Sequence, residues 1–186
     1  MPNYWGKAWK IARSRASCSQ LIAALFALVT FVVPPAFPQV ITGVAEGTLA
    51  PTFELKSLSN KSIRLSDYRG QIVVLNFWAT WCSPCRRETP MLVELDKEYR
   101  KKGVAILGID LDDFDAETIS KFVAEHKISY PIVVGDDETS HEYVGLGGLP
   151  ITFVIAPDGR VVKKFSGIAN AAELEDSLKP LLSGSH

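Results

Sequence analysis

The sequence has few of the side chains that usually bind transition metals. Its 186 residues include three cysteines and three histidines, and the histidines are scattered at His126, His141 and His186. Structural zinc sites are commonly built from closely spaced pairs of Cys or His ligands. Because this chain has one close cysteine pair and no second pair of Cys or His, we expect no metal site, no cofactor and solvated histidines.

The sequence also lacks a basic patch. Its formal net charge is −1, and the four cations of residues 1 to 45 are accompanied by no acid, so residues 46 to 186 carry 16 basic and 21 acidic side chains. Proteins that bind nucleic acid usually cluster Lys and Arg on one face. We therefore expect no nucleic-acid partner, and residues 46 to 186 are enough for one domain and too few for two.

No apolar run is as long as the ~20 residues that cross a membrane as a helix. The longest run, Leu21 to Val33, has thirteen residues interrupted only by Thr30, and Pro34-Pro35 ends it. Cations precede it, and this charge distribution keeps an N-terminus in the cytoplasm and sends the following chain across the membrane. Residues 1 to 45 are therefore predicted to hold a cytoplasmic basic start, a signal peptide or signal anchor, and a linker.

Cleavage and retention of residues 16 to 37 are two alternatives. Gly43-Val44-Ala45 has the small-x-small form of a processing site, but it ends twelve residues beyond Val33. This long spacing favours a retained anchor. In either case we expect the body of the protein in the bacterial periplasm or at the extracytoplasmic face of the inner membrane.

Two of the cysteines stand where a predicted strand meets a predicted helix. The apolar run Ile72 to Leu75 is typical of a strand covered on both faces, and a helical pattern begins near Pro84. A helix N-terminus stabilises a thiolate, so Cys82 is predicted to be a nucleophile, and Cys85 is placed to resolve a mixed disulfide at Cys82. A purely structural disulfide is less favoured because so short a loop adds little stability. The third cysteine, Cys18, is predicted to be incidental.

Strands and helices alternate along the rest of the chain, which predicts an α/β fold with parallel strand pairs. A linker is expected before residue 50. The expected strands are a pair around 53–55 and 63–65, then 72–77, 104–109, 131–134, 151–155 and 161–165. The last two strands flank Pro157-Asp158-Gly159, a turn signal that predicts a hairpin. The expected helices begin near residues 84, 115, 136 and 170, and Asn170 with Glu173 resembles a capping box at the start of the last one.

Acidic residues cluster after the strand expected at 104–109. Asp110, Asp112, Asp113 and Asp115 lack the glycine and the final glutamate of a calcium-binding EF-hand loop. We therefore interpret them as a turn at the strand end followed by a helix cap.

With these elements in place, residues Asn76 to Glu88, NFWATWCSPCRRE, and the pattern Ala50-Pro51-x-Phe53-x-Leu55 resemble the TlpA/ResA-type thiol-disulfide oxidoreductases of the thioredoxin superfamily. The second pattern is also similar to the opening of AhpC/TSA-like proteins. The resemblance covers roughly residues 46 to 183. It implies a thioredoxin-like three-layer fold, with a central mixed sheet flanked by helices, an N-terminal strand pair and an N-terminal membrane segment.

The resemblance also implies roles for residues around the cysteines. Pro150, which follows Leu149, matches the cis-proline that lies against the dithiol and helps to hold an extended partner segment. Trp81 joins these two residues in the predicted substrate contact. Ser83 and Pro84, between the cysteines, and Asn76 are predicted to tune the redox potential.

The proton acceptor differs from that of thioredoxin. Thioredoxin has a buried aspartate six residues before its first cysteine, and the matching residue here is Asn76, whose amide cannot titrate. Glu88 matches a glutamate that related reductases use, and we predict that it accepts the proton of Cys85. The alternative is a solvated Glu88 paired with Arg86 or Arg87.

The resemblance implies a dithiol that reduces disulfides in other proteins outside the cytoplasm. Apocytochrome c is the substrate class that it suggests first. A membrane-borne electron donor is expected to recycle the dithiol, because that compartment has no reducing glutathione pool. The protein is expected to contact the membrane through its N-terminal segment and to be a monomer.

Two other functions are weighed against this one. Peroxiredoxins share the Ala-Pro-x-Phe opening, but they place a threonine three residues before the peroxidatic cysteine, where this chain has Ala79, with Thr80 one step off. A non-enzymatic copper-binding module would use the two thiols with a neighbouring histidine, which is not evident. Both alternatives are therefore disfavoured.

Overall fold

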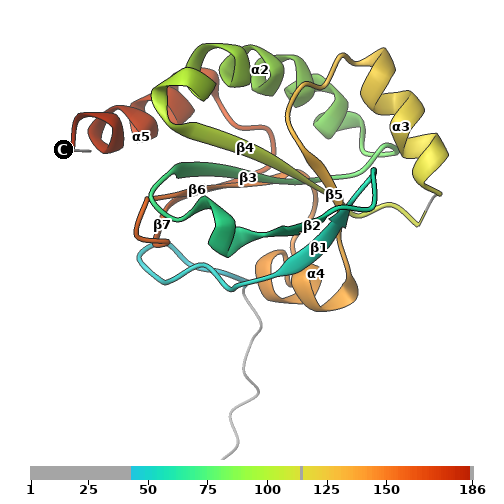
Figure 1. The fold of residues 1–186 in the computed structure, drawn as a ribbon, viewed down its shortest axis with the longest axis horizontal. Coiled ribbons are helices and arrows are strands. Elements are labelled where there is room, and N and C mark those ends of the chain that lie inside the picture. The colour runs from blue at the N-terminus through green and yellow to red at the C-terminus, as the bar shows by residue number, and fades with distance from the viewer. Residues whose placement is uncertain (1–42, 114, 185–186) are drawn as a thin grey trace, which may run out of the picture. The chain divides into compact units, whose positions relative to one another are not determined.

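The computed structural model describes residues 43–113 and 115–184, which contain one seven-stranded sheet in the order β2-β1-β5-β4-β3-β6-β7 (Figure 1). The strands are β1 (Glu54–Ser57), β2 (Ser62–Arg64), β3 (Ile72–Trp78), β4 (Val104–Asp110), β5 (Ile132–Val134), β6 (Ile151–Ile155) and β7 (Val161–Ser166). The helices are α2 (Ser83–Tyr99), α3 (Ala116–Glu125), α4 (Asp137–Tyr143) and α5 (Ala171–Ser183), with short 3-10 turns η1 (Leu65–Tyr68) and η2 (Arg100–Lys102).

The sheet is mixed, as the resemblance implies. β3 pairs in parallel with β4 and β4 with β5, while β6 and β1 join antiparallel on either side. Parallel neighbours need a crossover, and α2 connects β3 to β4 while α3 connects β4 to β5. β6 and β7 form the predicted hairpin, whose turn closes with a 2.8 Å hydrogen bond from Gly159 N to Ala156 O. β1 and β2 form the predicted edge pair.

Helices cover both faces of the sheet. β3 is buried along its whole length, and its side chains alternate between the two faces. Ile72, Val74 and Trp78 pack with the side formed by α2, α3 and α5, whereas Val73 and Phe77 pack with the side of α4. Figure 1 shows α2, α3 and α5 on one side of the sheet and α4 on the other. This three-layer arrangement confirms the predicted thioredoxin-like α/β fold.

The N-terminal arm, residues 43–50, is packed against the domain although the sequence predicts a linker there. Val44 and Ala50 are buried, and Gly47 N donates a 2.7 Å hydrogen bond to Val161 O. Small residues and glycines give no periodic signal, and their partners lie more than a hundred residues away. The order of this arm therefore comes from non-local pairing that composition does not reveal.

The predicted signal segment over residues 16 to 37, and Cys18 within it, lie outside the described residues. In the part of the chain that the structure describes, no helix is both long enough and apolar enough to cross a membrane. The membrane segment and the domain division at residue 45 therefore stay predictions.

Three central strands bring the predicted site residues to one edge of the sheet. Phe77 pairs with Ile109 of β4 and with Ile151 of β6. The chain leaves β3 after Trp78 towards the cysteines, and it enters the antiparallel β6 directly after Pro150. The cysteine segment and Pro150 therefore meet at the same edge.

Candidate active site

Cys82 and Cys85 are joined by a disulfide at the start of α2. Their Cα atoms are 5.3 Å apart, and 3% and 2% of their surfaces are exposed. Cys82 is the N-cap residue, and its Sγ accepts a 3.2 Å hydrogen bond from the backbone N–H of Cys85. Pro84 lies in the first turn, where its missing N–H removes no helix hydrogen bond. That turn contains no acidic side chain, so the positive end of the helix dipole is available to a thiolate on Cys82.

The residues around the disulfide differ in exposure. Trp81 is 62% exposed, which is unusual for so large an apolar side chain. Ser83 is exposed and Pro84 is partly buried. The disulfide itself is therefore buried, whereas its neighbours Trp81 and Ser83 are exposed to solvent.

The peptide bond between Leu149 and Pro150 is cis, which is the conformation that the resemblance implies. Pro150 is buried, and its carbonyl oxygen accepts a 2.9 Å hydrogen bond from Gly167 N. Leu149 is partly buried and packs against the cores on both faces of the sheet. Both residues are thus held firmly at the edge where the cysteines lie.

Asn76 of β3 and Glu88 of α2 form a buried hydrogen-bonded network between the sheet and the helix. They are 2% and 1% exposed, and Asn76 Nδ2 donates to Glu88 Oε2 at 2.9 Å and to Thr152 Oγ1 at 2.9 Å. The backbone N–H of Ala169 donates to Glu88 Oε1 at 2.7 Å. The two residues chosen from the sequence are therefore in direct contact, with the amide as donor and the carboxylate as acceptor.

The alternative of a solvated Glu88 paired with an arginine is wrong. Arg86 donates from Nε to the carbonyl oxygen of Thr80 at 2.8 Å, and Arg87 donates from Nη1 to Ser83 Oγ at 3.3 Å. Both arginines are exposed, whereas Glu88, the next residue along α2, is buried. Glu88 therefore has no counter-charge in its network.

Burial raises the pKa of Glu88, and the hydrogen bonds from Ala169 N and Asn76 partly oppose that rise. Desolvation disfavours the charged carboxylate, so Glu88 holds a proton more readily than an ordinary glutamate. A carboxylate with a raised pKa is a stronger base than a solvated one, which suits a group that takes a proton near neutral pH.

Thr152 and Ala169 are parts of this network that the sequence reasoning missed. Thr152 accepts from Asn76, and Ala169 contributes a backbone N–H. A signal exists for Thr152, because it lies inside the apolar run Ile151 to Ile155, and a polar side chain in a fully buried strand needs a hydrogen-bond partner. The contribution of Ala169 comes from the backbone and has no signal in side-chain identity.

The acidic cluster is only partly the turn and cap that the sequence predicts. Asp115 is the N-cap of α3, accepting from Thr118 N at 2.9 Å, and Asp113 is exposed. Asp110, however, ends β4 with none of its surface exposed, and Asp112 is 9% exposed. The sequence signal was the apolar run of β4, because Asp110 continues a strand that is buried on both faces.

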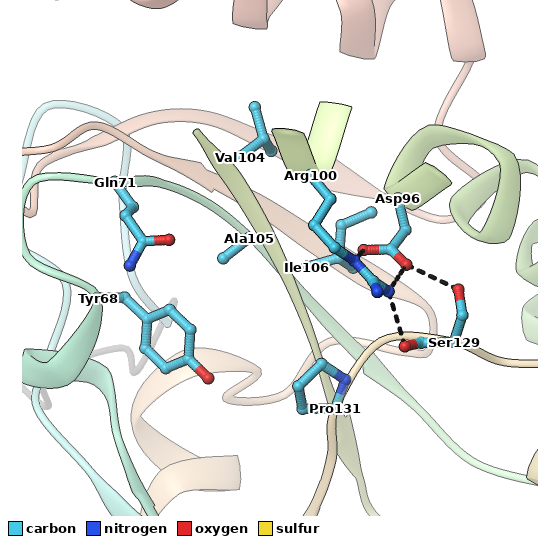
Figure 2. A pocket seen from close by; sticks show the side chains of 9 residues that line it. All are labelled: Tyr68, Gln71, Asp96, Arg100, Val104, Ala105, Ile106, Ser129 and Pro131. Carbon is cyan, nitrogen blue, oxygen red and sulfur yellow. Dashed lines mark hydrogen bonds and ion pairs between the residues drawn. The ribbon is translucent and has the colours of Figure 1, made fainter. Parts of the chain in front are cut away.

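A separate cavity of about 330 Å³ lies at the C-terminal end of α2 (Figure 2). Asp96 accepts hydrogen bonds from Arg100 and from Ser129 Oγ, the latter at 2.7 Å, and Arg100 Nη2 also donates to Ser129 O at 2.8 Å. Asp96, Arg100 and Ser129 are thus paired with one another at one side of this cavity. None of the predicted site residues lines it, so the candidate active site is a surface rather than this cavity.

In residues 43–113 and 115–184, no group of three or more His, Cys, Asp and Glu side chains is arranged to hold a metal ion. His141 is exposed, as predicted, but His126 is half-buried and stacks on the ring of Phe122 at 3.8 Å between centroids. The third histidine, His186, lies outside the described residues.

Comparison with known proteins assigns the chain to a family. Residues 47–164 match the AhpC/TSA family. Over 142 residues the chain is 39% identical to the thiol-disulfide oxidoreductase ResA of Geobacillus thermodenitrificans (strain NG80-2). This alignment covers 75% of this chain and 81% of that relative.

Solved structures agree with this assignment. A thiol:disulfide interchange protein of the thioredoxin family from Chlorobium tepidum TLS has a TM-score of 0.66 at 27% identity, covering 75% of this chain and 99% of that one. A secreted thiol-disulfide isomerase from Corynebacterium glutamicum has a TM-score of 0.66 at 28% identity, covering 73% of this chain and 86% of that one. The chain therefore belongs to the AhpC/TSA family and, within the thioredoxin superfamily, is a TlpA/ResA-type thiol-disulfide oxidoreductase.

Proposed function

We propose that this oxidoreductase reduces disulfides in exported proteins, with Cys82 as the nucleophile and Cys85 as the resolving thiol. The observation that carries the proposal is the position of Cys82 as the N-cap of α2, in a first turn without acidic side chains. The unpaired N–H groups and the dipole of the helix favour a thiolate there, and a thiolate is the form that attacks a disulfide.

The reaction proceeds by two exchanges. The thiolate of Cys82 attacks one sulfur of the substrate disulfide, which breaks that bond, forms a mixed disulfide and releases one substrate thiolate. Cys85 then loses its proton and attacks Cys82 Sγ, which releases the second substrate thiolate and forms the Cys82–Cys85 disulfide. Two electrons have moved to the substrate, so an electron donor must restore the dithiol.

Glu88 is proposed as the base that takes the proton of Cys85. It lies three residues further along α2, it is buried, and burial raises its pKa. The hydrogen bond from Asn76 orients the carboxylate of Glu88. Residue 76, where thioredoxin has its buried aspartate, therefore acts in this chain through Glu88. Asn76 therefore belongs with the residues that tune the site.

The remaining site residues are proposed to hold the partner segment or to tune the redox potential. Trp81 offers an exposed ring next to Cys82, and Leu149 and Pro150 form the edge against which a partner segment would lie. Ser83 and Pro84 stand between the cysteines, where they set the environment of the sulfur atoms and hence the potential.

The compartment is proposed to lie outside the cytoplasm. The basic and apolar start of the chain supports export, and one solved relative is described as secreted. Residues 16 to 37 would anchor the protein in the inner membrane or be removed after export. In that compartment a membrane-borne donor would recycle the dithiol, disulfide-bonded apocytochrome c is a candidate substrate, and the protein would act as a monomer.

Trapping tests the proposed function. Cys85→Ala leaves Cys82 able to attack but removes the resolving thiol, so mixed disulfides are expected to accumulate on the variant expressed in a bacterial host and to disappear when a reductant is added. The matched control is Cys82→Ser combined with Cys85→Ala, which has no thiol at the site and should capture nothing. Identifying the captured proteins by mass spectrometry tests the compartment and the substrate class. If Cys85→Ala captures no more protein than the control, Cys82 is not the nucleophile.

A further inference from the structure

Two carboxyl groups are buried behind the segment that leads to the cysteines. Asp110 lies opposite Trp78 of β3 and next to Val134 of β5. In the described residues, neither oxygen of Asp110 has a hydrogen-bond partner, and neither has Oδ1 of Asp112. The other oxygen of Asp112, Oδ2, accepts a 2.7 Å hydrogen bond from Thr80 N. Three carboxylate oxygens are thus buried without the partners that such atoms require.

One proton shared between the two acids would pair one oxygen of Asp110 with Oδ1 of Asp112, which are two of these three atoms. Burial, together with the neighbouring Asp112, raises the pKa of Asp110 to about 8. Two close carboxylates that are shielded from water do not both ionise readily, so one of them keeps a proton at neutral pH. A protonated Asp110 is a donor, and Oδ1 of Asp112 is an acceptor that lacks one. Asp112 can then remain negative and hold the N–H of Thr80.

This contact connects the acids to the dithiol loop, residues 79–82. Thr80 lies two residues before Cys82, and Cys82 N donates to Ala79 O at 3.1 Å. The loop is therefore short and internally bonded, and Asp112 holds it from the β4 side. A change in the charge of Asp110 and Asp112 would therefore reach the loop through the single hydrogen bond between Thr80 N and Asp112 Oδ2.

Few other charged groups face this region. Arg86 of α2 donates to the carbonyl oxygen of Thr80 at 2.8 Å, and its guanidinium lies 5.8 Å from the centre of the Phe122 ring. His126, the residue directly after α3, stacks on the same ring. Asp113, the next acid along the chain, is exposed. Arg86 thus contacts the carbonyl group of Thr80 from α2, while Asp112 contacts the N–H group of Thr80 from the end of β4.

We propose that Asp110 and Asp112 share one proton as a positioning pair behind the dithiol loop, and that loss of this proton disfavours reduction of the Cys82–Cys85 disulfide. Reduction leaves a thiolate on Cys82, and a second negative charge on the pair opposes that thiolate. By linkage, the pair holds its proton more tightly in the reduced protein than in the oxidised protein. This inference rests on the proposed role of Cys82 as the thiolate.

The test is the equilibrium with dithiothreitol between pH 6 and pH 9. Dithiothreitol closes to its cyclic disulfide and gives two electrons to the protein; of its two protons, one goes to Cys85 and one to solvent while Cys82 is a thiolate. The equilibrium constant is measured for the unmodified chain, for Asp110→Asn, which cannot lose a proton, and for Asp113→Asn as the matched control. Titration of dithiothreitol affects all three equally, so ratios between variants isolate the pair.

The ratio of the constant for Asp110→Asn to that of the unmodified chain is expected to be about fivefold or more larger at pH 9 than at pH 6. The ratio for Asp113→Asn should stay constant. A merely structural role of Asp110 would shift the constant equally at both pH values, and a pH-independent ratio would overturn the proposal.

A second measurement does not depend on the folding of a variant. Carbon-13 NMR titration of the aspartate carboxyl groups in the unmodified chain should show one buried group with a midpoint near pH 8 in the oxidised protein, and a higher midpoint after reduction. Equal midpoints in both redox states, or a midpoint below pH 5, would refute the proposal. Neither measurement uses a protein substrate, so its failure is distinguishable from failure of the trapping experiment.

Discussion

Replacing Asp110 by asparagine should change how the stability of this protein depends on pH. Asp110 has a pKa of about 8 in the folded protein against an ordinary value of 3.8. Between these values the folded state binds one proton more than the unfolded chain does. A proton that only the folded state holds stabilises it at low pH, and this contribution is fully present below pH 3.8 and is lost as pH rises to about 8.

The magnitude follows from the size of the shift. Each pH unit inside this window lowers the free energy of unfolding by about 1.4 kcal/mol. From pH 5 to pH 7 the unmodified chain should therefore lose about 3 kcal/mol relative to Asp110→Asn, which carries no titrating proton at this site. Glu88, whose pKa is also raised, contributes to the slope of both proteins, so its effect cancels in the difference.

The assay is chemical denaturation of the oxidised protein at pH 5, 6, 7 and 8, followed by far-ultraviolet circular dichroism. Asp113→Asn is the control, because Asp113 is exposed in the same segment, and its stability curve should run parallel to that of the unmodified chain. A constant difference between Asp110→Asn and the unmodified chain at all four pH values would refute the idea that Asp110 holds a buried proton.

Two further changes test the site and the sheet beneath it. Glu88→Gln keeps an acceptor for Ala169 N but cannot take a proton, so the release of a trapped mixed disulfide by Cys85 is expected to slow by about 100-fold in stopped-flow measurements. The control is Glu94→Gln, on the exposed side of α2, which should leave that rate unchanged. Equal rates for both variants would contradict the proposed role of Glu88 as the base. Gly108→Ala would place its Cβ 2.4 Å from Ile132 Cδ1 and 3.0 Å from Trp78 Nε1, so the free energy of unfolding measured by denaturation should fall by about 1–3 kcal/mol. The control is Gly148→Ala, where nothing lies within 4 Å, and it should cost much less. Equal losses would contradict the packing around Gly108.

The sequence predicts those parts of the fold that local patterns specify. The strand, the cysteine pair and the helix after it were all found, because an apolar run and a proline in the first turn mark them. The final hairpin and the cap of α5 follow from Pro157-Asp158-Gly159 and from Asn170, whose side chain accepts from Ala172 N and Glu173 N. Each of these signals acts within a few residues, so no knowledge of the tertiary fold was needed.

Features that depend on distant partners were not predictable in the same way. The N-terminal arm is held by the β6–β7 hairpin, and β1 pairs with β5, which lies about 75 residues further along the chain. Composition gives no register for such contacts. The burial of Glu88 is an intermediate case, because its spacing from Cys85 and Leu92 along α2 places it on the inward side, but the two arginines before it favour an exposed position.

The buried pair of Asn76 and Glu88 has a consequence for the way in which a proton can be stored there. Both oxygens of Glu88 face donors, Asn76 Nδ2 and Ala169 N. A proton arriving on Oε2 would face the hydrogens of the amide, unless the amide of Asn76 turned over and presented its oxygen instead. Thr152 can follow either orientation, because a hydroxyl both donates and accepts. An ionised aspartate at position 76 would offer only acceptors, whereas the amide of asparagine has one donor side and one acceptor side, so it can pair with Glu88 as a carboxylate or as a carboxylic acid.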